Sequence, residues 1–206
     1  MPADSPIKSM RDLKGARLTT GYAGQMTMRF VTDAMLESVG LSIKDIVAVP
    51  VMNSMQGTDI LGEGKVDAAV TAPGVAQVQK AHAELSGRGG VRFLPVETTP
   101  ESLAGMRKYM PARLMILEPA PHLPGIIGPT PVMAYSMYLV SNDKVSDDVA
   151  YRLVKMLHES RDDLIKVAPV VNRFDPKAMT EPTNAPWHAG AIKFYTEVGQ
   201  WPPKQS

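Results

Sequence analysis

The order of apolar and polar residues predicts alternating strands and helices through the first hundred residues. Short apolar runs bounded by glycine or proline are typical of strands, and apolar residues three or four positions apart are typical of helices. The expected strands are residues 16–20, 46–52, 66–71 and 91–96. The expected helices are residues 28–39, stopped by Gly40, and residues 54–64, 75–86 and 99–110. This alternation predicts an α/β layer built on a parallel sheet.

The second half of the chain follows a different pattern. Residues 118–132 contain five prolines and predict an extended connection. Residues 132–141 alternate as a strand, and residues 147–167 form one long amphipathic pattern that Ser146 is expected to cap. After a stretch with prolines at 169, 176 and 182, a closing helix is expected to open at His188.

Composition excludes several classes of function. The 206 residues carry a formal net charge of +1 and contain no cysteine. Near-balanced charge gives no electrostatic footprint for nucleic acid. The lack of cysteine excludes disulfides, thiolate catalysis, zinc–thiolate sites and iron–sulfur clusters. The first fifteen residues show no secretion signal, and no apolar run reaches the ~20 residues of a membrane-spanning helix.

The turn GYAGQMT lies between the first strand and the first helix. Its glycines would leave backbone N–H groups free at the helix N-terminus, where they could hold an anion. The alternative is a plain strand-to-helix turn whose glycines serve packing alone. The candidate ligand-binding residues here are Gly24, Gln25, Met26 and Thr27, with the Thr27 hydroxyl as a further donor.

A second small-residue turn, at Ala72, Pro73 and Gly74, follows the third expected strand. Ligands of open α/β sheets bind at the carboxyl ends of strands, so both turns are expected on one edge. The alternative is that these small residues merely permit close packing of helix and sheet.

The histidines argue against catalysis and metal binding. His82 and His158 are expected on solvated helix faces, and His122 lies in the proline-rich connection. No two histidines have metal-ligand spacing, and no nucleophile can be paired with a base. The chain is therefore predicted not to be an enzyme and to need no cofactor. His188 is expected to cap the last helix, with ligand contact as the alternative.

Four stretches together resemble one family. They are KSMRDLKGARLTTGYAGQMT, VDAAVTAPGVAQV, SDDVAYRLVKMLHES and APWHAGAIKFYTEVG, in that order from about Ser9 to Gly199. These segments resemble TAXI-type solute receptors, the extracytoplasmic binding proteins of TRAP transporters. The last stretch is the most specific, and it marks Pro186, His188 and Gly190 as a structural family motif. Gln25 and Met26 stand where the family usually has Ser and Gly, so this turn is bulkier.

The resemblance implies a type II periplasmic-binding-protein fold, in which two α/β lobes close on a small ligand. Residues 14–117 would form the second lobe, residues 118–132 a Pro/Gly-rich crossover, and residues 133–206 a segment returning toward the first lobe. The family's signal and first lobe would precede the residues seen here.

The function expected from this resemblance is capture of a small organic anion, such as an amino acid or a dicarboxylate, in the periplasm. The expected partners are the membrane subunits of a TRAP-type transporter, with a homodimer through an exposed lobe face as a further expectation. Two alternatives remain open. One is a ligand-free interaction or sensor-associated module, and the other is a small phosphoribosyltransferase-like enzyme.

Overall fold

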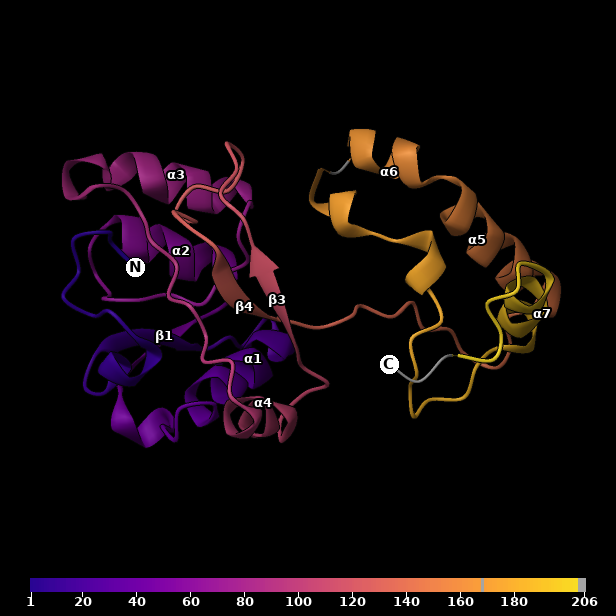
Figure 1. Cartoon of the computed structure of the whole chain (residues 1–206), viewed down its shortest axis with the longest axis horizontal. Helices are drawn as coiled ribbons and strands as arrows, with labels where there is room; N and C mark the ends of the chain where they lie inside the picture. The colour runs from indigo at the N-terminus through magenta and orange to yellow at the C-terminus, as the bar shows by residue number, and fades with distance from the viewer. Residues whose placement is uncertain (168, 204–206) are drawn as a thin grey trace. The chain divides into compact units, whose positions relative to one another are not determined.

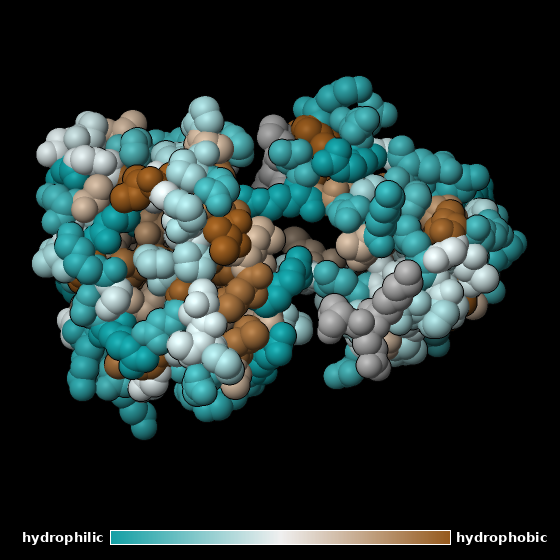
Figure 2. Space-filling model, in the orientation of Figure 1, coloured by the Kyte–Doolittle hydropathy of each residue, from teal (hydrophilic) through white to brown (hydrophobic). Residues whose placement is uncertain are grey.

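The computed structural model describes residues 1–167 and 169–203. The chain divides into two compact units, Met1–Ser136 and Met137–Ser206, and each is described by itself (Figure 1). The surface of each unit is mostly hydrophilic, with hydrophobic residues between the polar ones (Figure 2). No helix within the described ranges is long and apolar enough to cross a bilayer.

The first unit is built around a parallel strand pair. Strands β1 (Arg17–Gly21) and β2 (Val47–Val51) pair in parallel register, with Thr19 opposite Val49. Helix α1 (Met26–Glu37) provides the crossover that a parallel connection requires. The predicted strands at 16–20 and 46–52 and the helix between them are confirmed.

Gly40 ends α1 as the sequence predicts. Its φ is +72°, and its N–H donates to Glu37 O while the Leu41 N–H donates to Leu36 O. This pair of hydrogen bonds is the Schellman arrangement, which places a glycine in the left-handed region just after the helix.

Three further helices follow in this unit: α2 (Ser54–Gly62), α3 (Ala76–Glu84) and α4 (Pro100–Arg107). Short 3₁₀ segments occupy Met10–Leu13, Ile43–Asp45 and Ser86–Arg88. All three predicted helices are thus present, and each is shorter than its apolar pattern suggested. Thr99 caps α4 by accepting the N–H of Ser102, and Pro100 occupies the first helical position.

The prediction of a regular strand at 66–71 is wrong. This segment reaches β1 through a single parallel bridge between Leu18 and Ala68. Beyond that bridge, the Val70 N–H donates to the Thr19 hydroxyl at 3.2 Å instead of to a main-chain carbonyl. The Thr19 side chain therefore takes the place of the next main-chain hydrogen bond between this segment and β1.

The prediction of a strand at 91–96 is also wrong, because its backbone groups bond to several different segments. The Val91 N–H donates to His82 Nδ1 at 3.2 Å, and the Phe93 N–H donates to Gly125 O at 3.1 Å. The Val96 N–H donates to Pro131 O at 2.9 Å. The apolar β-rich run thus bonds these donors to separate segments without forming a ladder.

An antiparallel pair closes the first unit. Strand β3 (Arg113–Leu117) pairs with β4 (Thr130–Ala134), so the connection between them is shorter than the predicted 118–132. Strand β3, the run RLMIL, was not predicted. The strand predicted at 132–141 is wrong beyond Ala134, because Met137–Val140 lie in no helix or strand.

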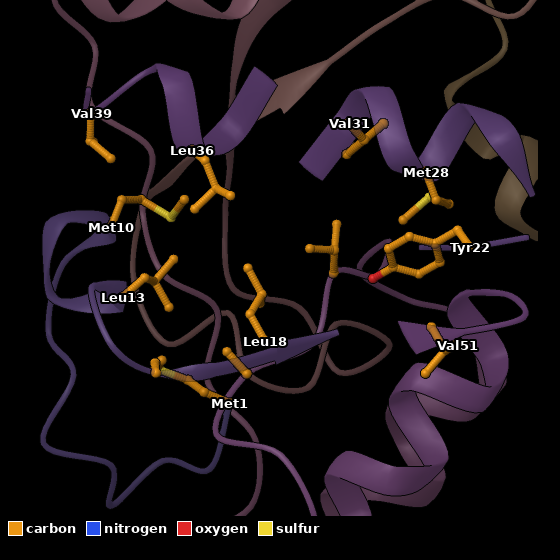
Figure 3. Packing of buried hydrophobic residues seen from close by; sticks show 13 residues of the cluster. Met1, Met10, Leu13, Leu18, Tyr22, Met28, Val31, Leu36, Val39 and Val51 are labelled. Carbon is orange, nitrogen blue, oxygen red and sulfur yellow. The ribbon is translucent and has the colours of Figure 1, made fainter. Parts of the chain in front are cut away.

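The core of the first unit lies between α1 and the parallel pair. Figure 3 shows Leu18 of β1 facing Leu36 of α1, and the ring of Tyr22 lying near Met28 and Val51. Burial of these side chains contributes the main stabilising free energy, at about 25 cal/mol per Å² of apolar surface.

The second unit is helical. It contains α5 (Asp147–Glu159), α6 (Arg161–Val167) and α7 (Ala189–Glu197), with 3₁₀ segments at Pro169–Arg173 and Pro176–Ala178. The single helix predicted at 147–167 is wrong, because the helix breaks at Ser160. The Ser160 carbonyl accepts the Leu164 N–H, and acidic residues follow in the first turn of α6, as at a helix start.

Helices α5 and α7 pack through aromatic rings. Phe194 of α7 meets the ring of Tyr151 edge-on at 5.7 Å and the ring of His158 at 5.2 Å. His158 Nε2 also lies 3.1 Å from Gln200 Nε2. The prediction of a solvated His158 is therefore wrong, because α7 covers that face of α5. The rings of Trp187 and Trp201 lie 5.5 Å apart in the same cluster.

Candidate functional site

The predicted binding turn begins where β1 ends. Gly21 has φ +78°, and Tyr22, a non-glycine residue, has φ +47°. Tyr22 is buried, and its hydroxyl lies 2.7 Å from the Thr19 hydroxyl. Burial raises the pKa of Tyr22, so the phenol stays protonated and acts as an anchor. The buried Tyr22 side chain holds its own backbone at positive φ, so the chain leaves β1 in a fixed orientation.

Half of the candidate N–H groups in this turn already have acceptors. The Gly24 N–H donates to Met52 O at 2.8 Å, and the Gln25 N–H donates to Tyr22 O at 2.8 Å. The N–H groups of Met26 and Thr27, in the first turn of α1, have no acceptor among the described residues. These two donors and the exposed Thr27 side chain are what the turn offers an anion.

Gln25 joins the first turns of two helices. Its side-chain Oε1 accepts the Ser54 N–H at 3.0 Å, at the start of α2. Neither α1 nor α2 carries an acidic residue in its first turn. Two positive helix ends therefore meet at the Gln25–Ser54 hydrogen bond, which favours a negative charge nearby.

The start of α2 is otherwise capped by its own side chains. Asn53 Oδ1 accepts the Gln56 N–H at 2.9 Å, and Gln56 Oε1 accepts the Met52 N–H at 2.7 Å. Sequence reasoning did not place α2 at this site. The dipeptide Asn53-Ser54 after a strand is a helix-start signal that could have done so.

Apolar side chains surround these donors. Met26, Phe30, Met52 and Met55 are all exposed large hydrophobic residues. Met26 and Met55 lie in the first turns of α1 and α2, Phe30 lies one turn further along α1, and Met52 follows β2. The edge therefore combines a few polar donors with an apolar rim, as small-molecule sites do.

The space beside the second predicted turn is partly filled by the chain itself. Gly74 has φ +85°, and a Cβ there would lie 3.0 Å from Leu123 Cδ2. Leu123 therefore occupies the space next to Gly74 where a ligand was expected to approach the backbone. No hydrogen bond joins Ala72, Pro73 or Gly74 to the Gly24–Thr27 turn within residues 1–167 and 169–203.

Two cavities of the first unit lie away from the Gly24–Thr27 turn. An apolar cavity of about 80 Å³ sits inside the core between Leu18, Met35 and Phe93. A polar groove of about 380 Å³ lies at the amino end of β1, where Arg17 pairs with Asp67 at 2.8 Å. Neither of these two pockets is lined by residues of the Gly24–Thr27 turn.

No group of three or more His, Cys, Asp or Glu side chains is arranged to hold a metal ion within the described residues. The side chains at the two helix starts include Thr27, Gln25, Ser54 and Met26. They can donate hydrogen bonds and offer apolar contact, which is the chemistry of binding.

The C-terminal motif lies in the second unit. His188 caps α7: its Nδ1 accepts the Gly190 N–H at 3.2 Å, while its Nε2 lies 2.9 Å from Val145 O. Gly190 lies against the backbone of Asp147, since an added Cβ would be 2.1 Å from Asp147 O. Pro186 lies just before this cap. The motif thus joins the start of α7 to the start of α5.

A parallel strand pair with helix N-termini at its carboxyl edge defines an α/β lobe of the kind found in periplasmic binding proteins. A family model described as the NMT1-like family matches residues 1–199, and the chain belongs to that family. Its members are periplasmic solute-binding proteins and not enzymes. This confirms the predicted fold class and the coarse prediction of a solute-binding role in the periplasm.

Proposed function

We propose that this chain captures a small organic anion, such as an amino acid or a dicarboxylate, for a TRAP-type transporter of the TAXI class. The observation that carries the proposal is the meeting of two helix N-termini at Gln25 and Ser54. The N–H groups of Met26 and Thr27 are available beside them. A carboxylate would accept these N–H groups and the Thr27 hydroxyl.

The neighbouring turn would contribute less than the first. Ala72, Pro73 and Gly74 would lie at the same edge, and Leu123 already occupies the space next to Gly74. We assign this turn to the outer boundary of the ligand site, where its backbone would limit the size of the ligand. The membrane subunits of the transporter would recognise the ligand-bound form.

A ligand-free interaction module is the second candidate. It is favoured by the exposed apolar side chains of Met26, Met52 and Met55, which a protein partner could also cover. The two candidates differ in one observable. A ligand that binds only the folded chain must raise its melting temperature, whereas an interaction module would not respond to small anions.

The test is a thermal-shift screen with amino acids and dicarboxylates, followed by calorimetric titration of any ligand found. Thr27→Ala should raise Kd roughly tenfold, because hydrogen bonds to charged groups contribute about 1.5–3 kcal/mol. Thr98→Ala is the matched control, since Thr98 is exposed and lies far along the chain from the turn. An unchanged Kd for Thr27→Ala would remove the site assignment, and a screen without any shift would favour the interaction module.

A further inference from the structure

The apolar cavity in the core of the first unit is lined by side chains from several elements. Helices α1, α2 and α3 contribute Leu36, Leu61 and Val78, and β1 contributes Leu18. These four residues are at most 3% exposed. Figure 3 shows Leu18 and Leu36 facing each other in this part of the core. The cavity therefore lies among fully buried side chains of both the helices and the strand.

A further wall is formed by residues 68–71 and 91–94, which belong to the two segments that were predicted as strands. Neighbouring strands of a sheet lie about 4.8 Å apart and leave no space between their backbones. Residues 91–94 instead bond to His82 and Gly125, while residues 68–71 bond to β1. Both segments line the cavity, so space that a regular ladder would close stays open.

Two threonines of the lining add little polarity to it. The Thr32 hydroxyl donates to Met28 O, and the Thr58 hydroxyl donates to Ser54 O, at 2.8 Å each. Both hydroxyl hydrogens are thus used within the helices that carry them. Walls of this kind hold apolar molecules more readily than water, because a buried water needs two to four polar partners.

The lining also includes a buried donor that has no acceptor. Arg92 Nη2 donates to Ser5 O at 3.2 Å and to Ile7 O at 2.7 Å. Arg92 Nε, in contrast, is buried and has no hydrogen-bond partner within the described residues. A buried donor without an acceptor is destabilising, and such groups are usually satisfied by water or by a ligand. The Nε–H group can therefore donate to an oxygen placed in the cavity.

We propose that this cavity binds a small neutral molecule with an apolar body and one acceptor oxygen, such as a short-chain ketone, and that Arg92 Nε donates to that oxygen. A cavity of roughly 150 Å³ with apolar walls holds benzene, so one of about 80 Å³ suits a molecule of roughly four non-hydrogen atoms. An anion would have to leave water for mostly apolar walls, which costs more free energy than one hydrogen bond returns. The site is separate from the Gly24–Thr27 turn, and it does not depend on the proposed function.

The experiment uses acetone and isobutene, which have the same shape but carry an oxygen and a methylene group at the same position. Each is titrated into the isotope-labelled whole chain, while NMR follows the amide signals of the lining and the Arg92 Nε–H signal. Both ligands are expected to bind with Kd between ~0.1 and ~10 mM, because few atoms limit the affinity. Acetone should shift the Arg92 Nε–H signal, and isobutene should shift it much less.

Arg92→Lys keeps the positive charge and removes Nε. It should raise the Kd of acetone roughly tenfold, because a hydrogen bond to a charged group is lost. The Kd of isobutene should not change, which also shows that the cavity of this variant is intact. An acetone affinity equal to that of the parent chain would overturn the proposal.

Ala68→Val/Val78→Leu fills the cavity with two methyl groups and one methylene group. It should raise the melting temperature by ~2–4 °C and abolish binding of both ligands. Val78→Leu alone is the smaller change if the double variant is overpacked, and it should weaken both ligands severalfold.

Thr27→Ala is the matched control, because it alters the candidate anion site and leaves the cavity unchanged. It should leave the affinities for acetone and isobutene as they are in the parent chain. Binding that persists in the filled variant would place the ligands elsewhere and overturn the proposal. So would a parent chain that does not bind isobutene.

Discussion

At the start of α7, the backbone of Gly190 lies against the backbone of Asp147 with no room for a side chain. A Cβ at this position would lie 2.1 Å from Asp147 O and 2.8 Å from Asp147 C. Neither atom belongs to a flexible side chain, so α5 and α7 would have to move apart. The glycine of the C-terminal motif is thus required by a close approach of two backbones, and its φ lies outside the left-handed region.

Gly190→Ala is expected to destabilise the second unit by about 1–3 kcal/mol, as overpacked sites do. The loss should appear even though alanine is the better helix former. Both tryptophans, Trp187 and Trp201, belong to this unit, so tryptophan fluorescence during urea unfolding reports on it directly.

Ser141→Ala is the control for this measurement, because Ser141 lies in the same unit and its side chain is exposed. It should change the unfolding free energy by less than about 0.5 kcal/mol. If Gly190→Ala were equally neutral, the backbone contact between α5 and α7 would not hold the unit together.

At the scale of elements, three aspartates tie segments of the first unit together. The Arg17 guanidinium holds the pKa of Asp67 below its usual range. Hydrogen bonds from the Lys8 and Ser9 N–H groups lower the pKa of Asp12, and the Ser42 hydroxyl lowers that of Asp45. Asp12 and Asp45 close the capping boxes of their 3₁₀ segments, while Asp67 joins β1 to the segment after α2.

The stability of the first unit should therefore fall in acid. A carboxylate with a depressed folded-state pKa stabilises the fold above its unfolded pKa of about 4, and the contribution is lost as the pH falls through the folded-state pKa. The urea midpoint, followed by far-UV circular dichroism, should decline from pH 4 toward pH 2. Asp67→Asn should lower the midpoint at pH 7 and make the decline shallower. A variant that declines as steeply as the parent would mean that Asp67 contributes nothing to the acid response.

The elements with a strong local signal were the predictable ones. Helix α1 has an apolar stripe and a terminal glycine, and α4 has a Thr-Pro start, so both follow from neighbouring residues alone. The segments 66–71 and 91–96 have equally strong β-type sequences. Their hydrogen bonds depend on the Thr19 hydroxyl and on Gly125 and Pro131, which lie far along the chain. Strand pairing is non-local, and a pattern in one segment cannot reveal whether a partner is present.

The candidate site was predictable only in part, for the same reason. The turn GYAGQMT identified the first helix end. The part played by Gln25, which accepts the Ser54 N–H, depends on a helix that starts 29 positions later. Likewise, the space beside Gly74 looked available to a ligand until Leu123 was found in it.

At the scale of the whole molecule, the chain passes from the first unit to the second just before an exposed stretch, Met137–Val140. Met137, Leu139 and Val140 are among the most exposed large hydrophobic residues of the described chain. The main-chain groups of Met137–Val140 form no hydrogen bond within the described residues. The local free energy of opening is therefore close to zero at this point and much higher on either side.

Limited digestion with chymotrypsin should cut first after Tyr138 or Leu139, because a protease needs an accessible segment that it can bind in extended form. Mass spectrometry of the early fragments should show the two units released whole. The variant Tyr138→Ser/Leu139→Ser should be cleaved much more slowly at this position. An initial cut within Met1–Ser136 would show that the first unit opens more readily than the Met137–Val140 segment.

The same four residues, Met137–Val140, are also expected to make the protein prone to aggregation in concentrated solution. A run of apolar, β-prone residues with unpaired backbone groups is a template for strand addition between molecules. A formal net charge of +1 gives the molecules little mutual repulsion at neutral pH. Concentrated solutions of this chain are therefore expected to form ordered aggregates that grow from the Met137–Val140 segment while both units remain folded.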